Sequence, residues 1–303
     1  MSRARNLGSF LLVTLLFGAV FPAIKVGLAD VPPLLFAAAR YYLSAALLLG
    51  YALVTTDRWR PRTRNDRIAV LAGGVLFVGG TGLSFVGLQF TTSGVGAIVF
   101  SLIPILTVLV AWVLLPDERP NRRGLLGVCV GFVGVAIVVR PDPAALGASV
   151  VGELLVLSAA AGVALGTVLV RRSRPTMPIV ALTGWAMAVG ATVQLGFALA
   201  LGESLAAVRP TASALAALLY LGVVGGAVGF VIYFTLLERL GALEINLIAY
   251  LVPIVTLAIG WAVLDEPIVP STVVGFLVVL VGFALLTDRE IAAELARFRG
   301  AGR

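Results

Sequence analysis

Two stretches of the sequence repeat one another and decide the fold: "IPILTVLVAWVLLPDE" at Ile103–Glu118 and "VPIVTLAIGWAVLDE" at Val252–Glu266. Each is an apolar run long enough for a helix, with a proline near its start and an Asp-Glu pair at its end. The likeness continues into the glycines that follow the two stretches, which are Gly127 and Gly134 after the first and Gly275 and Gly282 after the second. The sequence therefore predicts that one set of helices occurs twice.

The composition is that of a membrane protein. Of the 303 residues, 60% are hydrophobic and 12% are charged, and the mean hydropathy is +1.08, whereas about a quarter of the residues in an average soluble domain are charged. The net charge of +7 does not indicate a nucleic-acid partner, because the arginines lie in short loops and form no compact basic domain. With no histidine and the single Cys129, the sequence predicts no metal site and no internal disulfide.

Ten apolar runs near the ~20 residues that a helix needs to cross a bilayer follow one another along the chain. Runs this long and continuous predict helices and not the strands of a barrel. The ten predicted spans are Leu7–Leu28, Leu34–Thr55, Ile68–Leu88, Gly94–Leu115, Gly124–Val139, Val151–Val170, Pro178–Leu201, Ser213–Leu237, Leu243–Leu264 and Val269–Thr287.

The arginines predict how these spans are oriented. With the N-terminus in the cytoplasm, the cytoplasmic side receives the arginines of the N-terminus, of the loops near 58–67, 119–123, 171–174 and 239, and of the tail. The opposite side keeps only Arg140 and Arg209. Because basic loops mark the cytoplasmic side, we expect both termini in the cytoplasm.

The two copies divide the chain into a first half at residues 7–140, a second half at 150–288 and a cytoplasmic tail at 289–303. Each half contains five spans, and because five is odd the second half enters the membrane from the opposite side. The predicted fold class is an all-α integral membrane protein of ten transmembrane helices, built as two inverted five-helix repeats. Inverted repeats are typical of alternating-access transporters, although duplication also allows an inert scaffold or a symmetric channel.

Both halves resemble a known family. The segment "LLFGAVFPAIKVGLADVPPLLFAAARYYLSAALLL" at residues 15–49 is similar to the opening of an EamA-type repeat of the drug/metabolite transporter superfamily. The prolines, Asp-Glu pairs and glycines of the two repeated stretches resemble the close of that repeat. The resemblance implies a ten-helix carrier without a cofactor, usually an exporter of small metabolites. It also implies that the fifth and tenth helices are peripheral and that the others surround a central cavity.

Charges inside the spans are the first candidate functional residues, because such charges are costly in a membrane. Lys25 and Arg40 are predicted either to bind substrate or to fix helix ends by snorkelling outward or pairing with Asp30. If Arg40 faces the cavity, it is suited to bind a carboxylate with two parallel hydrogen bonds. The second half has no counterpart of this pair, so any role of these charges is asymmetric.

The repeated stretches supply candidate hinges and gates. Pro104 and Pro253 each remove an intrahelical hydrogen bond and should kink the fourth and ninth spans, with the hydroxyls of Thr107 and Thr256 available to the freed carbonyls. The acids that follow are interpreted either as charges that end a helix or as gates at the two mouths, with Arg40 as a partner on the outer side. These gate candidates are Glu118, Asp265 and Glu266.

Polar and aromatic side chains within the spans are the remaining substrate-binding candidates: Gln89, Ser101, Trp185, Gln194, Tyr220, Tyr233, Asn246 and Tyr250. Ser101, Asn246 and Tyr250 lie nearest the predicted kinks. A pocket of this kind has no deep carboxylate, which favours neutral, zwitterionic or anionic solutes. Glu244 is the candidate for proton coupling, with Glu153 and Glu238 at helix ends as further titratable groups.

The sequence predicts a secondary-active transporter that moves small metabolites, such as amino acids, across the cell membrane by alternating access and in the direction of export. Its expected partners are the solute and the lipid bilayer, as a monomer or homodimer, with no cofactor and no nucleic acid. No nucleotide-binding motif is present, which excludes ATP-driven transport by this chain alone. The alternatives are a uniporter or channel-like facilitator and a membrane-embedded enzyme, although paired acids and histidine are lacking for the latter.

Overall fold

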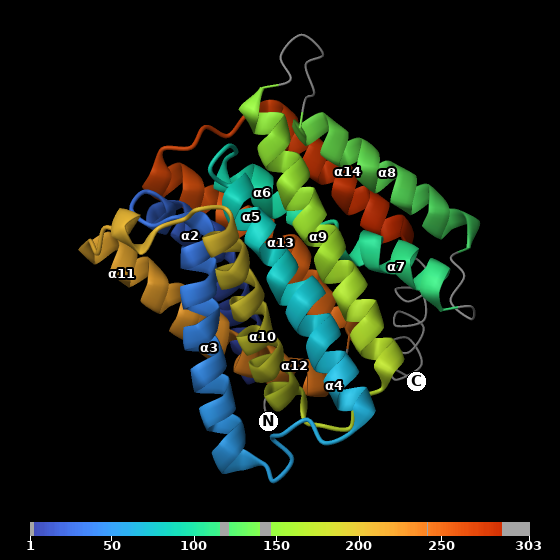
Figure 1. Cartoon of the computed structure of the whole chain (residues 1–303). Coiled ribbons are helices and arrows are strands. Elements are labelled where there is room, and N and C mark those ends of the chain that lie inside the picture. Colours follow the sequence, from blue (N-terminus) through green and yellow to red (C-terminus); the bar gives the residue numbers. More distant parts are fainter. Residues whose placement is uncertain (1–2, 116–120, 140–146, 241, 287–303) are drawn as a thin grey trace.

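The computed structural model describes residues 3–115, 121–139, 147–240 and 242–286, and every regular element among them is a helix (Figure 1). The expected tail at 289–303 lies outside the described residues. The elements are α1 (Arg3–Gly18), α2 (Val20–Leu28), α3 (Pro33–Thr55), α4 (Arg64–Leu71), η1 (Ala72–Val78), η2 (Gly79–Thr81), α5 (Gly82–Gly87), α6 (Ser93–Phe100), α7 (Ile103–Leu114), α8 (Arg122–Val139), α9 (Ala148–Ser173), α10 (Ile179–Ala200), η3 (Leu205–Ala207), α11 (Ala212–Leu219), η4 (Tyr220–Val228), α12 (Gly229–Leu240), α13 (Ala242–Leu264) and α14 (Pro270–Leu286).

Among the described residues, nine helical stretches are long and apolar enough to cross a membrane. They coincide with the first nine predicted spans to within about one helical turn. The tenth predicted span, Val269–Thr287, appears as α14, whose 17 residues lie at the lower limit of length for crossing a bilayer. The prediction of an all-α membrane protein is confirmed.

Several spans are interrupted helices. The glycine-rich segments Ala72–Val78 and Tyr220–Val228 form the π-helices η1 and η4, at corresponding places in the two sequence copies. The fourth span breaks between α6 and α7, immediately before Pro104, whereas α13 continues through Pro253. A helix break therefore accompanies Pro104, and a kink at Pro253 stays a prediction.

The first span breaks near Pro22, and another span satisfies the carbonyl that this proline frees. Because proline has no N–H, the carbonyl of Gly18, four residues earlier, loses its intrahelical partner. The Thr256 hydroxyl in α13 donates to that oxygen at 2.7 Å. The sequence pointed to Thr256 as a partner for carbonyls in its own kinked helix, but its side chain is instead directed to the first span.

Two further hydrogen bonds connect a polar side chain in one span to the irregular backbone of another. Gln194 Nε2 in α10 donates to the carbonyl of Val78, the last residue of η1, at 2.7 Å. Ser44 Oγ in α3 donates to the carbonyl of Gly222 in η4 at 2.8 Å. Each π-helix thus receives a hydrogen bond from the second span of the other sequence copy.

Two acids connect the sequence copies, one at the start of α3 and one at the segment before α10. The Glu203 carboxylate, which follows α10, accepts the backbone N–H groups of residues 34 and 35 at 3.1 and 2.9 Å. A carboxylate at a helix N-terminus satisfies free donors and stabilises the helix dipole, so Glu203 caps α3. The Asp66 carboxylate, in the first turn of α4, accepts the N–H groups of residues 176 and 177 at 2.8 and 3.3 Å and so binds the segment that precedes α10.

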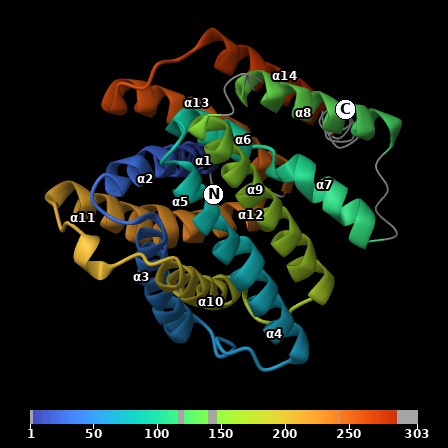
Figure 2. The ribbon, with the colours of Figure 1, turned by 45° about the horizontal axis from the view of Figure 1, so that its top comes forward.

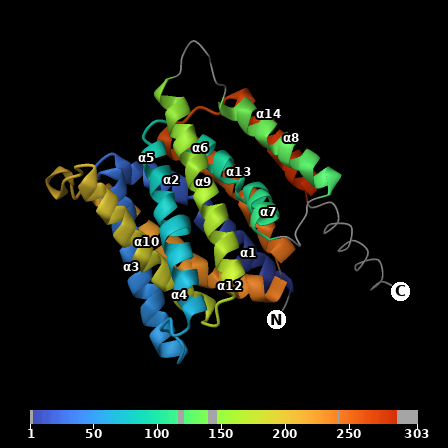
Figure 3. The same ribbon diagram turned by 45° about the vertical axis from the view of Figure 1, so that its right-hand side comes forward.

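α8 and α14 pack closely against each other through four glycines and lie side by side at one edge of the helix bundle in all three views (Figures 1, 2 and 3). Gly127 faces Gly282, and Gly134 faces Gly275. A Cβ on Gly282 would lie 2.7 Å from the Gly127 carbonyl oxygen, and one on Gly134 would lie 2.7 Å from that of Gly275. Only glycine allows this approach, as in other membrane helix pairs with small residues at the interface. The position at the edge agrees with the peripheral place that the resemblance implies.

Gly275→Ala is expected to lower the free energy of unfolding by about 1–3 kcal/mol, as overpacking typically does. The added Cβ would lie 2.6 Å from the Gly134 carbonyl oxygen. The matched control is Gly50→Ala in α3, where no atom lies within 4 Å and no destabilisation is expected. Thermal unfolding in detergent, followed by tryptophan fluorescence, measures both variants, and equal melting temperatures would contradict the close packing of α8 on α14.

Candidate functional site

A cavity of about 580 Å³ lies where the loop between α5 and α6 meets α2, α9 and the end of α13. Both sequence copies contribute to its lining. The polar lining residues are Lys25, Gln89, Thr91, Thr92, Ser149, Glu153 and Glu266, and the apolar ones are Phe90, Val95 and Leu264. Its volume is in the range of pockets that hold small organic ligands, so this cavity is the candidate functional site.

Lys25 is held at the wall of the cavity by backbone carbonyls. Its Nζ donates to the carbonyls of Leu88 at 3.1 Å and of Thr91 at 2.8 Å, at the C-terminal end of α5. A lysine in this position satisfies carbonyls that the helix leaves free and stabilises the helix dipole. The ammonium group has three donors, so one remains for another partner.

Glu266 forms a bridge between the two sequence copies. Its oxygens accept the backbone N–H of Ser93 at 2.9 and 3.0 Å, and one of them accepts the Ser93 hydroxyl at 2.6 Å. The carboxylate therefore caps the N-terminus of α6. The Glu266 carboxylate can approach Ser93 because Gly260 has no side chain. A Cβ on Gly260 would lie 2.7 Å from both Glu266 Oε2 and Ser93 Oγ.

The neighbouring Asp265 lies where the chain turns after α13. Its side chain is exposed, and its backbone adopts φ +53°, a left-handed conformation that aspartate tolerates better than most residues. The chain turns back at this point, and the Glu266 N–H donates to the carbonyl of Gly260 at 3.1 Å. The Asp-Glu pair after α13 thus ends this helix and caps α6, and a gating role remains a prediction.

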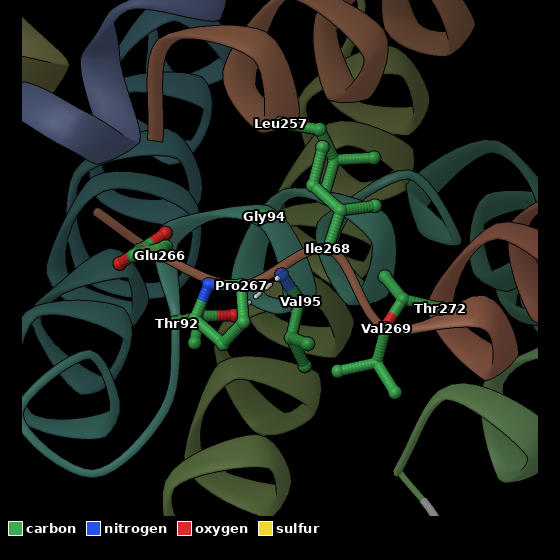
Figure 4. Close-up of a pocket in the computed structure, with 9 residues that line it drawn as sticks. All are labelled: Thr92, Gly94, Val95, Leu257, Glu266, Pro267, Ile268, Val269 and Thr272. Carbon is green, nitrogen blue, oxygen red and sulfur yellow. Dashed lines mark hydrogen bonds between the residues drawn. The ribbon is translucent and has the colours of Figure 1, made fainter. Parts of the chain in front are cut away.

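A second, smaller pocket of about 80 Å³ adjoins the cavity and shares Thr92, Val95 and Glu266 with it. Figure 4 shows the polar side chains of Glu266 and Thr92 on one side, and the side chains of Leu257, Ile268, Val269 and Thr272, of which the last carries a hydroxyl, on the other. The dashed line marks the bond from the Val95 N–H to the Thr92 hydroxyl, which caps α6 a second time. Its size suits a water molecule or a methyl group better than a metabolite.

Glu153, which the sequence analysis named only as a further titratable group at a helix end, lines the cavity. It lies in the second turn of α9 and is 6% exposed. Thr91 Oγ1 lies 3.5 Å from its Oε1, and its buried Oε2 has no hydrogen-bond partner. Its position in the second turn of an apolar helix was the available signal, because acids within spans are functional candidates.

Arg40 lies outside the lining of this cavity. It is 8% exposed, and its guanidinium carbon lies 4.1 Å from the ring centre of Tyr41 and 5.4 Å from that of Phe85. Its buried Nε has no hydrogen-bond partner. Stacking on two aromatic rings compensates part of the cost of burying the charge, and a role of Arg40 in binding substrate remains a prediction.

The structure separates most of the other candidates from the cavity. Trp185 donates its Nε1–H to the carbonyl of Trp59 at 2.8 Å and stacks on that ring. Tyr233 lies in an aromatic cluster with Phe17, Phe230 and Phe234. Gln89 is exposed and lines the cavity.

Two of the candidates near the predicted kinks, Ser101 and Tyr250, are buried. Ser101 donates to the carbonyl of Ile98 at 2.7 Å. Tyr250 stacks on Phe283 at a ring distance of 3.9 Å, and its hydroxyl has no partner. Glu118 and the side chains of Asn246 and Glu244 lie outside what the structure describes.

Within the described parts of the chain, no group of three or more histidine, cysteine, aspartate or glutamate residues is arranged to hold a metal ion. The polar groups around the cavity are instead an ammonium, two carboxylates, an amide and hydroxyls. Such a set can bind and orient a small polar solute through charge and hydrogen bonds.

Comparison with known proteins gives a consistent result. The sequence profile of the EamA-like transporter family matches residues 7–140 and 150–288. The chain is 28% identical to the uncharacterized transporter YvbV of Bacillus subtilis (strain 168), over 97% of this chain and 95% of that protein. It is 27% identical to the "Probable amino-acid metabolite efflux pump" of Salmonella typhimurium (strain LT2), over 90% of this chain and 91% of that protein. A crystal structure with 20% sequence identity shares the fold, with a TM-score of 0.66 over 97% of this chain and 99% of that one.

Glu266→Ala is expected to destabilise the protein by about 1–3 kcal/mol, because it leaves the Ser93 N–H and hydroxyl without their partner. The control is Asp265→Asn, which removes the adjacent charge and keeps a side chain that tolerates the left-handed backbone. The melting temperatures of the two variants in detergent are compared to test whether Glu266 stabilises the fold. An unchanged melting temperature for Glu266→Ala, together with faster transport, would favour a gate over a structural cap.

Proposed function

The chain belongs to the EamA-like transporter family, and on this basis we propose that it is a secondary-active transporter that exports small metabolites by alternating access. The relatives are named as transporters, and the apolar helices make the chain a multi-pass membrane protein. The observation that carries the proposal is the match of one transporter repeat to each half of the chain, at residues 7–140 and 150–288.

The two halves are proposed to be inverted repeats related by a pseudo-two-fold axis in the membrane plane. Such an axis exchanges equivalent contacts, so a contact from the first half to the second has a counterpart in the other direction. The two hydrogen bonds to π-helices and the glycine pairs of α8 and α14 follow this pattern. Ten spans, with α14 as the tenth, agree with this symmetry.

Both termini are proposed to be cytoplasmic, in the cell membrane, because this orientation gives the cytoplasmic loops most of the arginines. The cavity then faces the outer side, where the loops after α5 and α13 lie. Alternating access would require the cavity to close on the outer side and to open toward the cytoplasm.

The break before Pro104 and a bend at Pro253 are the proposed hinges, and Glu266 with Ser93 is the proposed outer gate. Glu118 is the proposed inner counterpart, and Glu244 stays the coupling candidate.

The proposed substrates are amino acids or related neutral, zwitterionic or anionic solutes. The cavity volume of about 580 Å³ accommodates molecules of this size, and one relative is named as an amino-acid metabolite efflux pump. Transport would be driven by a solute or ion gradient, since the sequence has no nucleotide-binding motif.

Vesicles with the purified protein are expected to exchange an external radiolabelled amino acid for an internal unlabelled one, with a rate that saturates. Counterflow of this kind requires a binding site that alternates between the two sides. Uptake that rises linearly with concentration would favour a channel-like facilitator. Absence of uptake with amino acids, organic acids and neutral metabolites would contradict the transporter proposal.

If Arg40 is a ligand of the solute, Arg40→Ala is expected to weaken transport of a carboxylate solute by roughly 10- to 100-fold, the usual effect of losing a charged hydrogen bond. The control is Arg60→Ala, which removes a guanidinium that lies over the Trp59 ring in a loop. Both variants are first compared by size-exclusion chromatography. An unchanged apparent affinity with lower yield of folded Arg40→Ala protein would assign Arg40 to stability instead.

A further inference from the structure

Glu153 and Lys25 both contact Thr91. Lys25 Nζ donates to the Thr91 carbonyl, and the Thr91 hydroxyl, at the long distance of 3.5 Å, is the one hydrogen-bond partner of the Glu153 carboxylate among the described residues. Both side chains line the 580 Å³ cavity. The cavity therefore presents a positive and a negative group that contact the same residue.

The two acids of the cavity, Glu266 and Glu153, differ in the hydrogen bonds that their carboxylate oxygens accept. The Glu266 oxygens accept three hydrogen bonds from Ser93, whereas Glu153 has one long contact and an unpartnered, buried Oε2. A carboxylate withdrawn from water without a partner is strongly unfavourable. A cation that arrives from the cavity removes this cost, as does uptake of a proton by the carboxylate.

Lys25 limits what that partner can be. Two of its three donors are used by carbonyls, so its ammonium is fixed in place and keeps one donor for a ligand. A ligand that contacts Glu153 with a positive group and Lys25 with a negative one would neutralise both sites at once. An ammonium group and a carboxylate on adjacent carbons, as in an α-amino acid, match this arrangement of charges.

We propose that Glu153 is the binding residue for the ammonium group of the transported solute, and that Lys25 contributes the site for its carboxylate. The proposal rests on the proposed transport function, whose substrate class it narrows from neutral, zwitterionic or anionic solutes to those that carry a primary ammonium group. In the empty protein the unpartnered, buried Oε2 of Glu153 is unfavourable, so Glu153 is not expected to stabilise the fold.

The test uses the purified full-length protein in detergent and the twenty common α-amino acids as probes, with binding followed as a rise in melting temperature. Each amino acid that stabilises the protein is then compared with the 2-hydroxy acid that replaces its ammonium group by a hydroxyl, and with the amine that lacks its carboxylate. We expect the 2-hydroxy acid to bind roughly 10- to 100-fold more weakly, because it loses a charged hydrogen bond.

Glu153→Gln keeps the shape of the side chain and removes its charge. We expect binding of the amino acid and of the amine to weaken by roughly 10- to 100-fold, while the melting temperature of the empty protein is unchanged or rises. Lys25→Gln should reduce the advantage of the amino acid over the amine and leave binding of the amine in place.

Glu203→Gln is the matched control. Glu203 lies outside the cavity, and both of its oxygens cap α3, so Gln offers one acceptor in place of two. The control variant should have a lower melting temperature and normal binding, the reverse of Glu153→Gln.

The outcomes separate this proposal from the proposed function. Equal binding of the 2-hydroxy acid, normal amino-acid binding by Glu153→Gln, or stabilisation by no amino acid and no amine would each overturn the ammonium site. Saturable counterflow of a neutral or anionic solute would then still support the transporter. Absence of counterflow with every solute class would overturn the transporter itself, whatever binds at Glu153.

Discussion

The hydrocarbon core of a bilayer contains no water, so a backbone carbonyl that a helix leaves free there needs a partner from the protein. The spans of this chain are interrupted by prolines and π-helices, and the partner repeatedly comes from another span. Three side chains donate hydrogen bonds to backbone carbonyls of other spans: Thr256 to Gly18, Gln194 to Val78, and Ser44 to Gly222. These bonds explain why polar residues occur inside otherwise apolar spans, and they also fix which spans pack together.

The same requirement explains most of the charged residues at the helix ends. Glu203 and Glu266 each direct a carboxylate to free N–H groups of a distant helix, and Asp66 directs one to the segment before α10. Lys25 directs its ammonium to free carbonyls. Glu153 stands apart because its environment leaves one oxygen unsatisfied. A group that the resting structure does not satisfy, at the wall of a cavity, is where a ligand gains the most from binding.

The spans could be predicted because the length of an apolar run is a local property of the sequence. The partners of individual side chains could not, because they depend on packing between distant segments. Glu266 and Ser93 are separated by 173 positions, and no periodicity connects them. Trp185 was a plausible cavity residue by its position in a span, but it stacks on Trp59 from a loop. The two prolines look equivalent in sequence, yet of the two only Pro104 lies at a break, whereas α13 continues through Pro253.

The cap that Glu203 supplies to α3 has a consequence for the biosynthesis of the protein. The N-terminus of α3 is closed by Glu203, 169 residues further along the chain from Leu34. At the translation rate of roughly 5–20 residues per second, α3 remains in the membrane for about ten seconds or more before its cap is synthesised. During that interval the ribosome-bound chain has to be kept inserted by the translocation machinery or by lipid contacts, because its own second half does not yet exist.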